Sequence, residues 1–299
     1  KSGDASIGGA LGAKAKFAKD YAARRYKDVI ADGELLRKTG ALDGQSQLVI
    51  AQAYYQMGDK QGCIRYVRKT FGNGAGEDAL QLLQRCAYDA NDDETQRYAL
   101  EQLVARTGKP EYWSNLLKLS ERAHGMNDHS TLDIYRLNLM TGAINGADEY
   151  TLLAQLALQL GFPAEAQGVL QKGIDNKAIP PTDRINRLMN LAKKQTGADA
   201  ANQGNAIAAA KGAPQGDALV KIGEDQIGQG KAKDAIATIQ AGMAKPLKDK
   251  NNAQIRLGMA YMAAGQKDAA IRAFNAVKPT GPNDKSGMIA HLYSLAARR

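Results

Sequence analysis

Apolar residues recur every three or four positions along most of the chain, which is the period of an amphipathic helix. The segment "NNAQIRLGMAYMAAGQKDAAIRAF", Asn251 to Phe274, shows the pattern clearly. Ala, Leu, Gln and Lys are abundant, whereas clusters of β-branched and aromatic residues are scarce, so helix is favoured over strand. The eight prolines lie mostly between the periodic segments, where they would end helices. The pattern therefore predicts an all-α protein.

The same arrangement of residues returns several times. Tyr54–Val67 and Tyr261–Phe274 each place a glycine four residues after an aromatic residue, followed by a polar run and an Ile-Arg pair. Such self-similarity at a period of about 20 to 50 residues indicates stacked structural repeats. Four copies fall in register, at 44–77, 147–180, 216–249 and 251–284.

The last copy resembles the tetratricopeptide repeat (TPR) consensus. It carries Leu257-Gly258, Tyr261, Ala270, Phe274 and Pro282 at the spacings of that motif, and lacks its opening Trp. The resemblance implies a right-handed α-solenoid of about eight TPR-like antiparallel helix pairs, forming a single superhelical array over 1–299. Less regular units are expected at 8–40, 78–110, 111–145 and 182–214, and a C-terminal capping helix at 284–299.

The residue types of the repeat have physical roles. Small residues such as Gly258, Ala166 and Ala270 would let two helices approach closely. Glycines at the end of the first helix of a pair would adopt the left-handed conformation that glycine tolerates and that ends a helix. These glycines are Gly58, Gly161, Gly230 and Gly265, and Asn91 stands at the turn of a divergent unit.

The net charge of +9 is unevenly distributed. Residues 1–72 carry 13 Lys/Arg against 7 Asp/Glu, residues 73–180 carry 9 against 15, and residues 181–299 carry 18 against 9. Basic ends around an acidic middle could attract an acidic partner, an anionic polymer or a membrane surface. The alternative is a solvated surface that keeps the protein soluble.

Signatures of catalysis, metals and phosphate binding are weak. His124 and His129 are five residues apart, which matches no zinc signature, and a solvated loop is the expectation. The glycine-rich Phe71–Asp78 and the acidic Asp89–Glu94 read as turns between helices rather than as phosphate or calcium loops. We predict no enzyme activity, no catalytic residue, no metal and no cofactor.

The TPR resemblance also implies a concave groove, lined by the first helix of each pair, that holds a peptide or a partner helix. The expected groove positions mix amides and apolar groups with few cations, so a clamp for a C-terminal carboxylate is doubtful, and nucleic acid is an unlikely ligand. These positions are Gln45, Leu48, Gln52 and Tyr55; Asp148, Thr151, Gln155 and Leu158; Asp217, Val220, Glu224 and Ile227; and Asn252, Ile255, Met259 and Met262.

The two cysteines lie on consecutive apolar stripes. Cys63 and Cys86 are equally far from the turn between two helices, so an antiparallel pair would place them side by side. We predict a Cys63–Cys86 disulfide; the alternative is two small buried thiols. A disulfide would favour an oxidising compartment. The chain begins at Lys1 rather than Met, which is compatible with a removed signal peptide or with a trimmed cytosolic chain.

We expect a protein-protein interaction scaffold for an unidentified protein or peptide, acting in a bacterial envelope assembly, secretion or polymer-export system. The expected location is the periplasm or envelope, with a cytoplasmic adaptor as the alternative. A second hypothesis is direct binding of an anionic polymer or membrane surface by the basic ends, including Lys231, Lys233 and Lys245.

Overall fold

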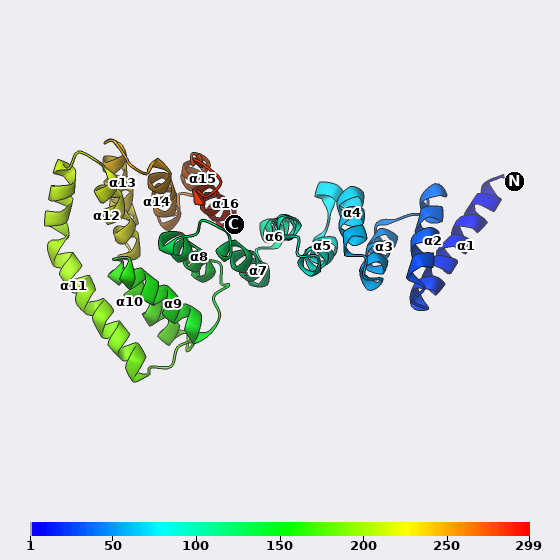
Figure 1. Ribbon diagram of the computed structural model, residues 1–299, viewed down its shortest axis with the longest axis horizontal. Coiled ribbons are helices and arrows are strands. Elements are labelled where there is room, and N and C mark those ends of the chain that lie inside the picture. Colours follow the sequence, from blue (N-terminus) through cyan, green and yellow to red (C-terminus); the bar gives the residue numbers. More distant parts are fainter. Residues whose placement is uncertain (1) are drawn as a thin grey trace. The chain divides into compact units, whose positions relative to one another are not determined.

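The computed structural model describes residues 2–299, with side chains from residue 9 onwards. These residues form sixteen α-helices and one short 3-10 helix, and they contain no strand (Figure 1). The predicted all-α class is confirmed. The chain divides into two compact units, Lys1–Thr107 and Gly108–Arg299, where a single array was expected.

Unit 1, residues 1–107, contains three helix pairs in its described part. They are α1 (Ser2–Ala22) with α2 (Tyr26–Lys38), α3 (Gly44–Gln56) with α4 (Lys60–Phe71), and α5 (Glu77–Asp89) with α6 (Asp93–Thr107). A 3-10 helix, η1 (Gly72–Gly74), lies between α4 and α5. Consecutive helices pack against each other, and Val29, Leu36 and Ile50 are buried between the first pairs.

Unit 2, residues 108–299, holds four further pairs, one long helix and a closing helix. The pairs are α7 (Pro110–Glu121) with α8 (Asp128–Met140), α9 (Gly146–Gln159) with α10 (Pro163–Asp175), α12 (Asp217–Gly228) with α13 (Ala232–Met243), and α14 (Lys250–Ala263) with α15 (Lys267–Asn275). The long helix is α11 (Asp183–Gly212), and the closing helix is α16 (Ser286–Ala297).

The turns inside the pairs share one geometry. Gly58, Gly161, Gly230 and Gly265 have φ angles between 76° and 87°, and Asn91 has a φ of 53°. At Gly265 the backbone N–H reaches Met262 O, and the next N–H, of Gln266, reaches Tyr261 O. The same two hydrogen bonds recur at the other four turns. This pattern satisfies carbonyls at the end of the first helix, so the predicted left-handed turns are confirmed.

Small residues allow close helix contacts, as the repeat pattern indicates. A Cβ added to Gly258 on α14 would overlap the ring of Phe274 on α15. Ala166 and Ala270 are fully buried at equivalent contacts. Glycine and alanine at these positions therefore set the distance between the helices of a pair.

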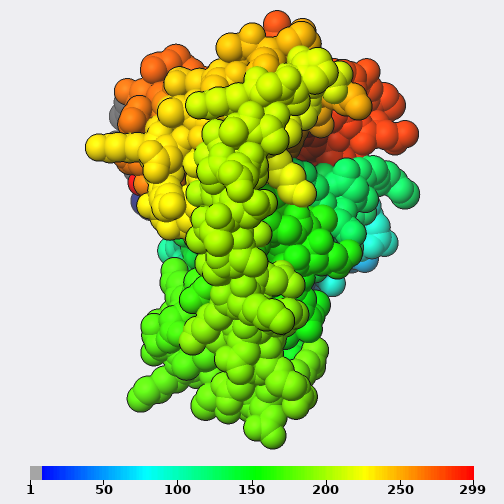
Figure 2. Space-filling model, turned by 90° about the vertical axis from the view of Figure 1, so that its left-hand side faces the viewer, coloured from blue at the N-terminus to red at the C-terminus, as the bar shows by residue number. Residues whose placement is uncertain are grey.

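The interpretation of 182–214 as a helix pair is wrong, because α11 is a single helix of 30 residues. Its internal glycines, Gly197 and Gly204, both lack the positive φ of the turn glycines. The helix contains no proline, and its alanines are strong helix formers that offset the cost of two glycines. Figure 2 shows α11 as a continuous ridge, which contacts α9 and α10 near its start and α12 near its end.

The closing helix does more than cap the last pair. α16 packs on α14 and α15 as expected, and it also contacts α8, near the beginning of the unit (Figure 1). Tyr293 is fully buried, and its hydroxyl donates to the backbone carbonyl of Asp133, 2.9 Å away. Unit 2 is therefore joined across its two ends.

Candidate functional site

The predicted disulfide is confirmed. Cys63 on α4 and Cys86 on α5 form a disulfide with their Cα atoms 6.5 Å apart. Both residues are fully buried. The bond joins the second helix of one pair to the first helix of the next, so it stabilises the contact between repeats and leaves no reactive thiol at this position.

The groove positions of α3 lie on an exposed face of unit 1. Gln45 is exposed, while Leu48, Gln52 and Tyr55 are partly exposed. Gln52 accepts a hydrogen bond from Tyr21 OH on α1 at 3.2 Å. The guanidinium of Arg85 on α5 lies 5.6 Å from the ring centroid of Tyr55. The first helices of three successive pairs therefore contribute to this face.

Two further residues of this face, Arg85 and Tyr88, are not among the groove positions predicted from the sequence. Arg85 and Tyr88 occupy the same places on α5 as Gln52 and Tyr55 on α3, and 62% of Tyr88 is exposed. Aligning the helix starts, rather than the less regular repeat boundaries at 78–110, would have found them.

The groove positions of α9 border an open cavity. Asp148, Thr151 and Gln155 line a cavity of about 360 Å³ whose opposite wall includes Ile179 and Arg184. Leu158, the fourth expected position, instead packs partly buried against the core of the unit. Three of the four positions on this helix are thus accessible from one cavity.

Most groove positions of α12 and α14 are buried or paired within unit 2. Four of them, Val220, Glu224, Ile255 and Met259, are buried in unit 2. Asp217 accepts backbone N–H groups of Lys248 and Asp249, Asn252 accepts from Arg256, and Ile227 packs on the core. Met262 is partly exposed. The protein's own packing therefore occupies most of this part of the expected groove.

A buried network of charges fills the space where these helices meet. Arg256 on α14 donates two hydrogen bonds to Asp133 on α8, at 2.6 and 2.8 Å. Arg136 on α8 donates to Glu224 on α12 at 2.7 Å and makes two bonds of 2.8 Å to Glu165 on α10. Five residues from four helices are thus held in one network.

The network is electrostatically paired. Burial alone would raise the pKa of Glu224, but the guanidinium charges of Arg256 and Arg136 outweigh that effect and hold its pKa well below the usual range. Burial opposes the charge of Arg256, and Asp133 and Glu224 overcome it, so the pKa of Arg256 is raised. The charged states are stable here because each ion has buried partners.

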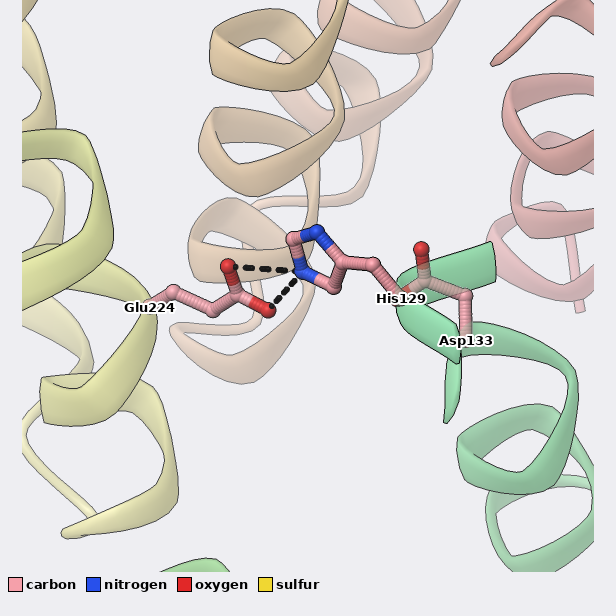
Figure 3. A group of neighbouring side chains, drawn as sticks. All are labelled: His129, Asp133 and Glu224. Carbon is pink, nitrogen blue, oxygen red and sulfur yellow. Dashed lines mark hydrogen bonds and ion pairs between the residues drawn. The ribbon is translucent and has the colours of Figure 1, made fainter. Parts of the chain in front are cut away.

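His129 extends this network and corrects the expectation of a solvated loop. It lies in the first turn of α8, and its Nε2 is 2.8 Å from Glu224 Oε2. Figure 3 shows the imidazole reaching from α8 towards Glu224, with Asp133 one turn further along α8. The side chain is 35% exposed, at a polar cavity of about 290 Å³ that Asp133 and Arg256 also line.

The same groups could be considered as metal ligands. His129, Asp133 and Glu224 offer ligand atoms within 4.8 Å of one another. Two guanidinium groups already bind the oxygens of these carboxylates. A divalent cation would lie against two positive charges and compete for those oxygens. The arrangement suits a salt-bridge network that ties helices together better than it suits a metal.

The other stretches considered for chemistry are turns. Phe71–Asp78 contains η1 and the start of α5, where Glu77 and Asp78 occupy the first helical turn. In Asp89–Glu94, Asp92 accepts the backbone N–H of Thr95 at 3.0 Å and so caps α6. Both were interpreted as connections between helices, and that interpretation is confirmed.

No protein-family model matches the chain, and no curated protein matches its sequence. Solved structures with a similar fold include a tetratricopeptide repeat protein from Parabacteroides merdae, at 12% identity and a TM-score of 0.38, covering 96% of this chain and 98% of that one. Another is the TPR domain of P58(IPK), at 12% identity and a TM-score of 0.30, covering 97% of both chains.

A third similar structure is the Cut9–Hcn1 hetero-tetramer of the APC/C. Its identity to this chain is 13%, its TM-score is 0.26, and the match covers 96% of this chain and 70% of that one.

The helix pairs, their shared turns and the small residues at their contacts define a TPR-like fold. Stacked helix pairs of this kind present extended surfaces. Among residues 2–299, no helix combines the length and the apolar character that crossing a bilayer requires.

Proposed function

We propose that this protein is a non-catalytic scaffold that binds an extended segment of another protein. The observation that carries the proposal is the cavity beside α9, which is bordered by Asp148, Thr151 and Gln155 at positions expected to face a ligand. Stacked helices hold these side chains on a rigid frame. Extended peptides are commonly bound on such frames by apolar anchors and polar groups that pair with the peptide backbone.

Site-specific photo-crosslinking tests this function. A photoreactive amino acid at Thr151 should give a discrete crosslinked product with one partner in cells that make the protein naturally. The same amino acid at Lys172, which is exposed on α10, is the matched control and should give no such product. Identical products from both positions, or none from Thr151, would contradict partner binding at α9.

We further propose that the protein acts in an oxidising compartment, the bacterial periplasm or envelope, within an assembly, secretion or polymer-export system. The buried disulfide supports this location, because such bonds persist mainly outside reducing compartments. Alkylation of free thiols in intact cells before lysis should leave both cysteines unmodified. Labelling of both would instead favour a reduced cytoplasmic adaptor.

Binding of an anionic polymer or surface is the second candidate function. It is favoured by α4, which carries Lys60, Arg65, Arg68 and Lys69 without an acidic residue. Charge reversal at Lys231, Lys233 and Lys245, or separately at Arg65 and Lys69, should reduce salt-sensitive retention on heparin. Unchanged retention in both variants would exclude this candidate.

A further inference from the structure

Leu152 on α9 separates two cavities of different chemistry. Leu152 is 49% exposed, so its apolar surface is accessible to a ligand. It lines both the cavity of about 360 Å³ described above and a second cavity of about 140 Å³ towards α7 and α8. We call these two cavities together, with Leu152 between them, the α9 groove.

The larger cavity can hold an apolar side chain. Ile179, Pro180 and Ile185 form its apolar wall between the end of α10 and the start of α11. At its rim, the amide of Gln155 makes no hydrogen bond to another described residue. An amide carries both donors and an acceptor, so the side chain of Gln155 can pair with the backbone of an extended segment.

The smaller cavity is acidic. Glu121 and Glu149 both line it, and Lys118 is its only lining cation and makes no ion pair with either carboxylate. The hydroxyl of Tyr135 donates to Glu121 at 3.1 Å.

The two carboxylates of this cavity also act on Tyr135, although burial has the larger effect on that side chain. Burial, followed by the charges of Glu121 and Glu149, raises the pKa of that hydroxyl to about 12. Both carboxylates belong to the acidic middle of the chain, since residues 73–180 contain 15 Asp/Glu and only 9 Lys/Arg.

We infer that the α9 groove binds a partner segment carrying an apolar side chain close to a lysine or arginine. The apolar side chain enters the larger cavity, the apolar part of the chain crosses Leu152, and the cation lies beside Glu121 and Glu149. Charge complementarity fixes the direction and the choice of partner more than the total affinity. This inference rests on the proposed scaffold function and specifies the chemistry of the partner.

Short synthetic peptides test this chemistry with the full chain. Fluorescein-labelled octapeptides of Gly and Ser carry one Leu and one Lys at separations of one to four residues, and matched sets replace Lys by Glu or Leu by Ser. Fluorescence anisotropy should show that one or more Leu/Lys peptides bind about tenfold tighter than both matched peptides. Equal binding of the Leu/Lys and Leu/Glu sets would overturn the inference.

Two variants and a control locate the binding. Glu121→Gln with Glu149→Gln should abolish the preference for Lys over Glu while keeping the contribution of Leu. Leu152→Arg should weaken every peptide, and Asp175→Asn, on α10 outside both cavities, should change nothing. Thermal unfolding followed by circular dichroism checks that each variant is folded. A preference that survives in the double variant would also overturn the inference.

The crosslinking and peptide experiments distinguish failure of the scaffold function from failure of the proposed partner chemistry. A product at Thr151 combined with peptides that do not distinguish Lys from Glu would leave the scaffold function intact and remove only the proposed partner chemistry. A charge-dependent preference lost in the double variant supports the chemistry of the groove, even where crosslinking finds no partner and the scaffold function fails.

Discussion

Two neighbouring carboxylates on α12 have opposite environments. Glu224 is bound by two guanidinium groups, and its pKa is lowered. Asp225 has one oxygen, Oδ1, that is buried without a hydrogen-bond partner among the described residues, while Oδ2 accepts from Gln229. Burial, and then the charges of Asp199, Glu165 and Glu224, raise the pKa of Asp225 to about 6. Asp225 is therefore a destabilising ion at neutral pH.

Asp225→Asn should raise the free energy of unfolding by about 1 kcal/mol at pH 7.5. This value is smaller than the free energy that corresponds to a pKa shift of about two units, because the side chain is partly solvated. The folded state binds this proton more tightly than the unfolded chain. The penalty therefore exists above pH 6, shrinks as the pH falls, and is absent below about pH 4. Urea denaturation of both proteins at pH 7.5 and pH 4 measures the difference. An equal effect at both pH values would contradict this account.

The buried network marks the limit of what single residues reveal in the sequence. Glu224 falls at an expected groove position, and a charged residue there reads as ligand-facing. Two of its partners in the structure, Arg136 and His129, lie 88 and 95 residues away in the chain. Pairing over such separations depends on how the helices of unit 2 curve back on one another, which no local pattern records.

At the scale of elements, the sequence was most informative where a local conformation demands one residue type. A left-handed turn favours glycine, so Gly58, Gly161 and Gly230 could be placed at helix ends from spacing alone. Glycine inside a helix carries no such signal. Gly197 and Gly204 resemble turn glycines in the sequence, and only their flanking alanines argue for the continuous helix α11.

Two glycine substitutions should therefore act in opposite directions. Gly265→Ala should lower the free energy of unfolding by about 1 kcal/mol, because alanine must adopt a φ of 76° there. The added Cβ meets no other atom, so no steric clash adds to this backbone strain. Gly204→Ala should raise the free energy of unfolding by about 0.5 to 1 kcal/mol. The residue lies inside α11 with open space around the added Cβ, so alanine fits the folded state and reduces the conformational freedom of the unfolded chain. Chemical denaturation of both variants gives the comparison. Destabilisation by Gly204→Ala would indicate that α11 bends or opens at that residue.

At the scale of the whole molecule, the two compact units carry different stabilising features. Unit 1 contains the disulfide, which closes a loop with a sequence separation of 23 residues. Unit 2 contains the charge network and Trp113, the single tryptophan of the chain. Fluorescence of Trp113 therefore reports unfolding of unit 2 alone, while circular dichroism reports both units.

Replacement of both Cys63 and Cys86 by alanine should lower the stability of unit 1 by about 3 kcal/mol, the value expected for a loop of this length. Alanine fits at position 63, since Ala270 occupies the equivalent place in the last repeat. The circular dichroism transition should begin at lower urea concentration, whereas the Trp113 transition should not move. Equal shifts of both signals would show that the units unfold together.

The bond from Tyr293 to Asp133 changes how unit 2 should respond to damage. In a linear repeat array each repeat contacts only its neighbours, so loss of a terminal repeat removes contacts from the adjacent repeat alone. Here residues 160 positions apart are in direct contact, and Arg256 binds the same aspartate. Loss of α16 removes a contact from α8 as well as from α15. Because its last helix packs on its second helix, unit 2 should unfold cooperatively from end to end, and a truncation at the C-terminus should destabilise α8 directly.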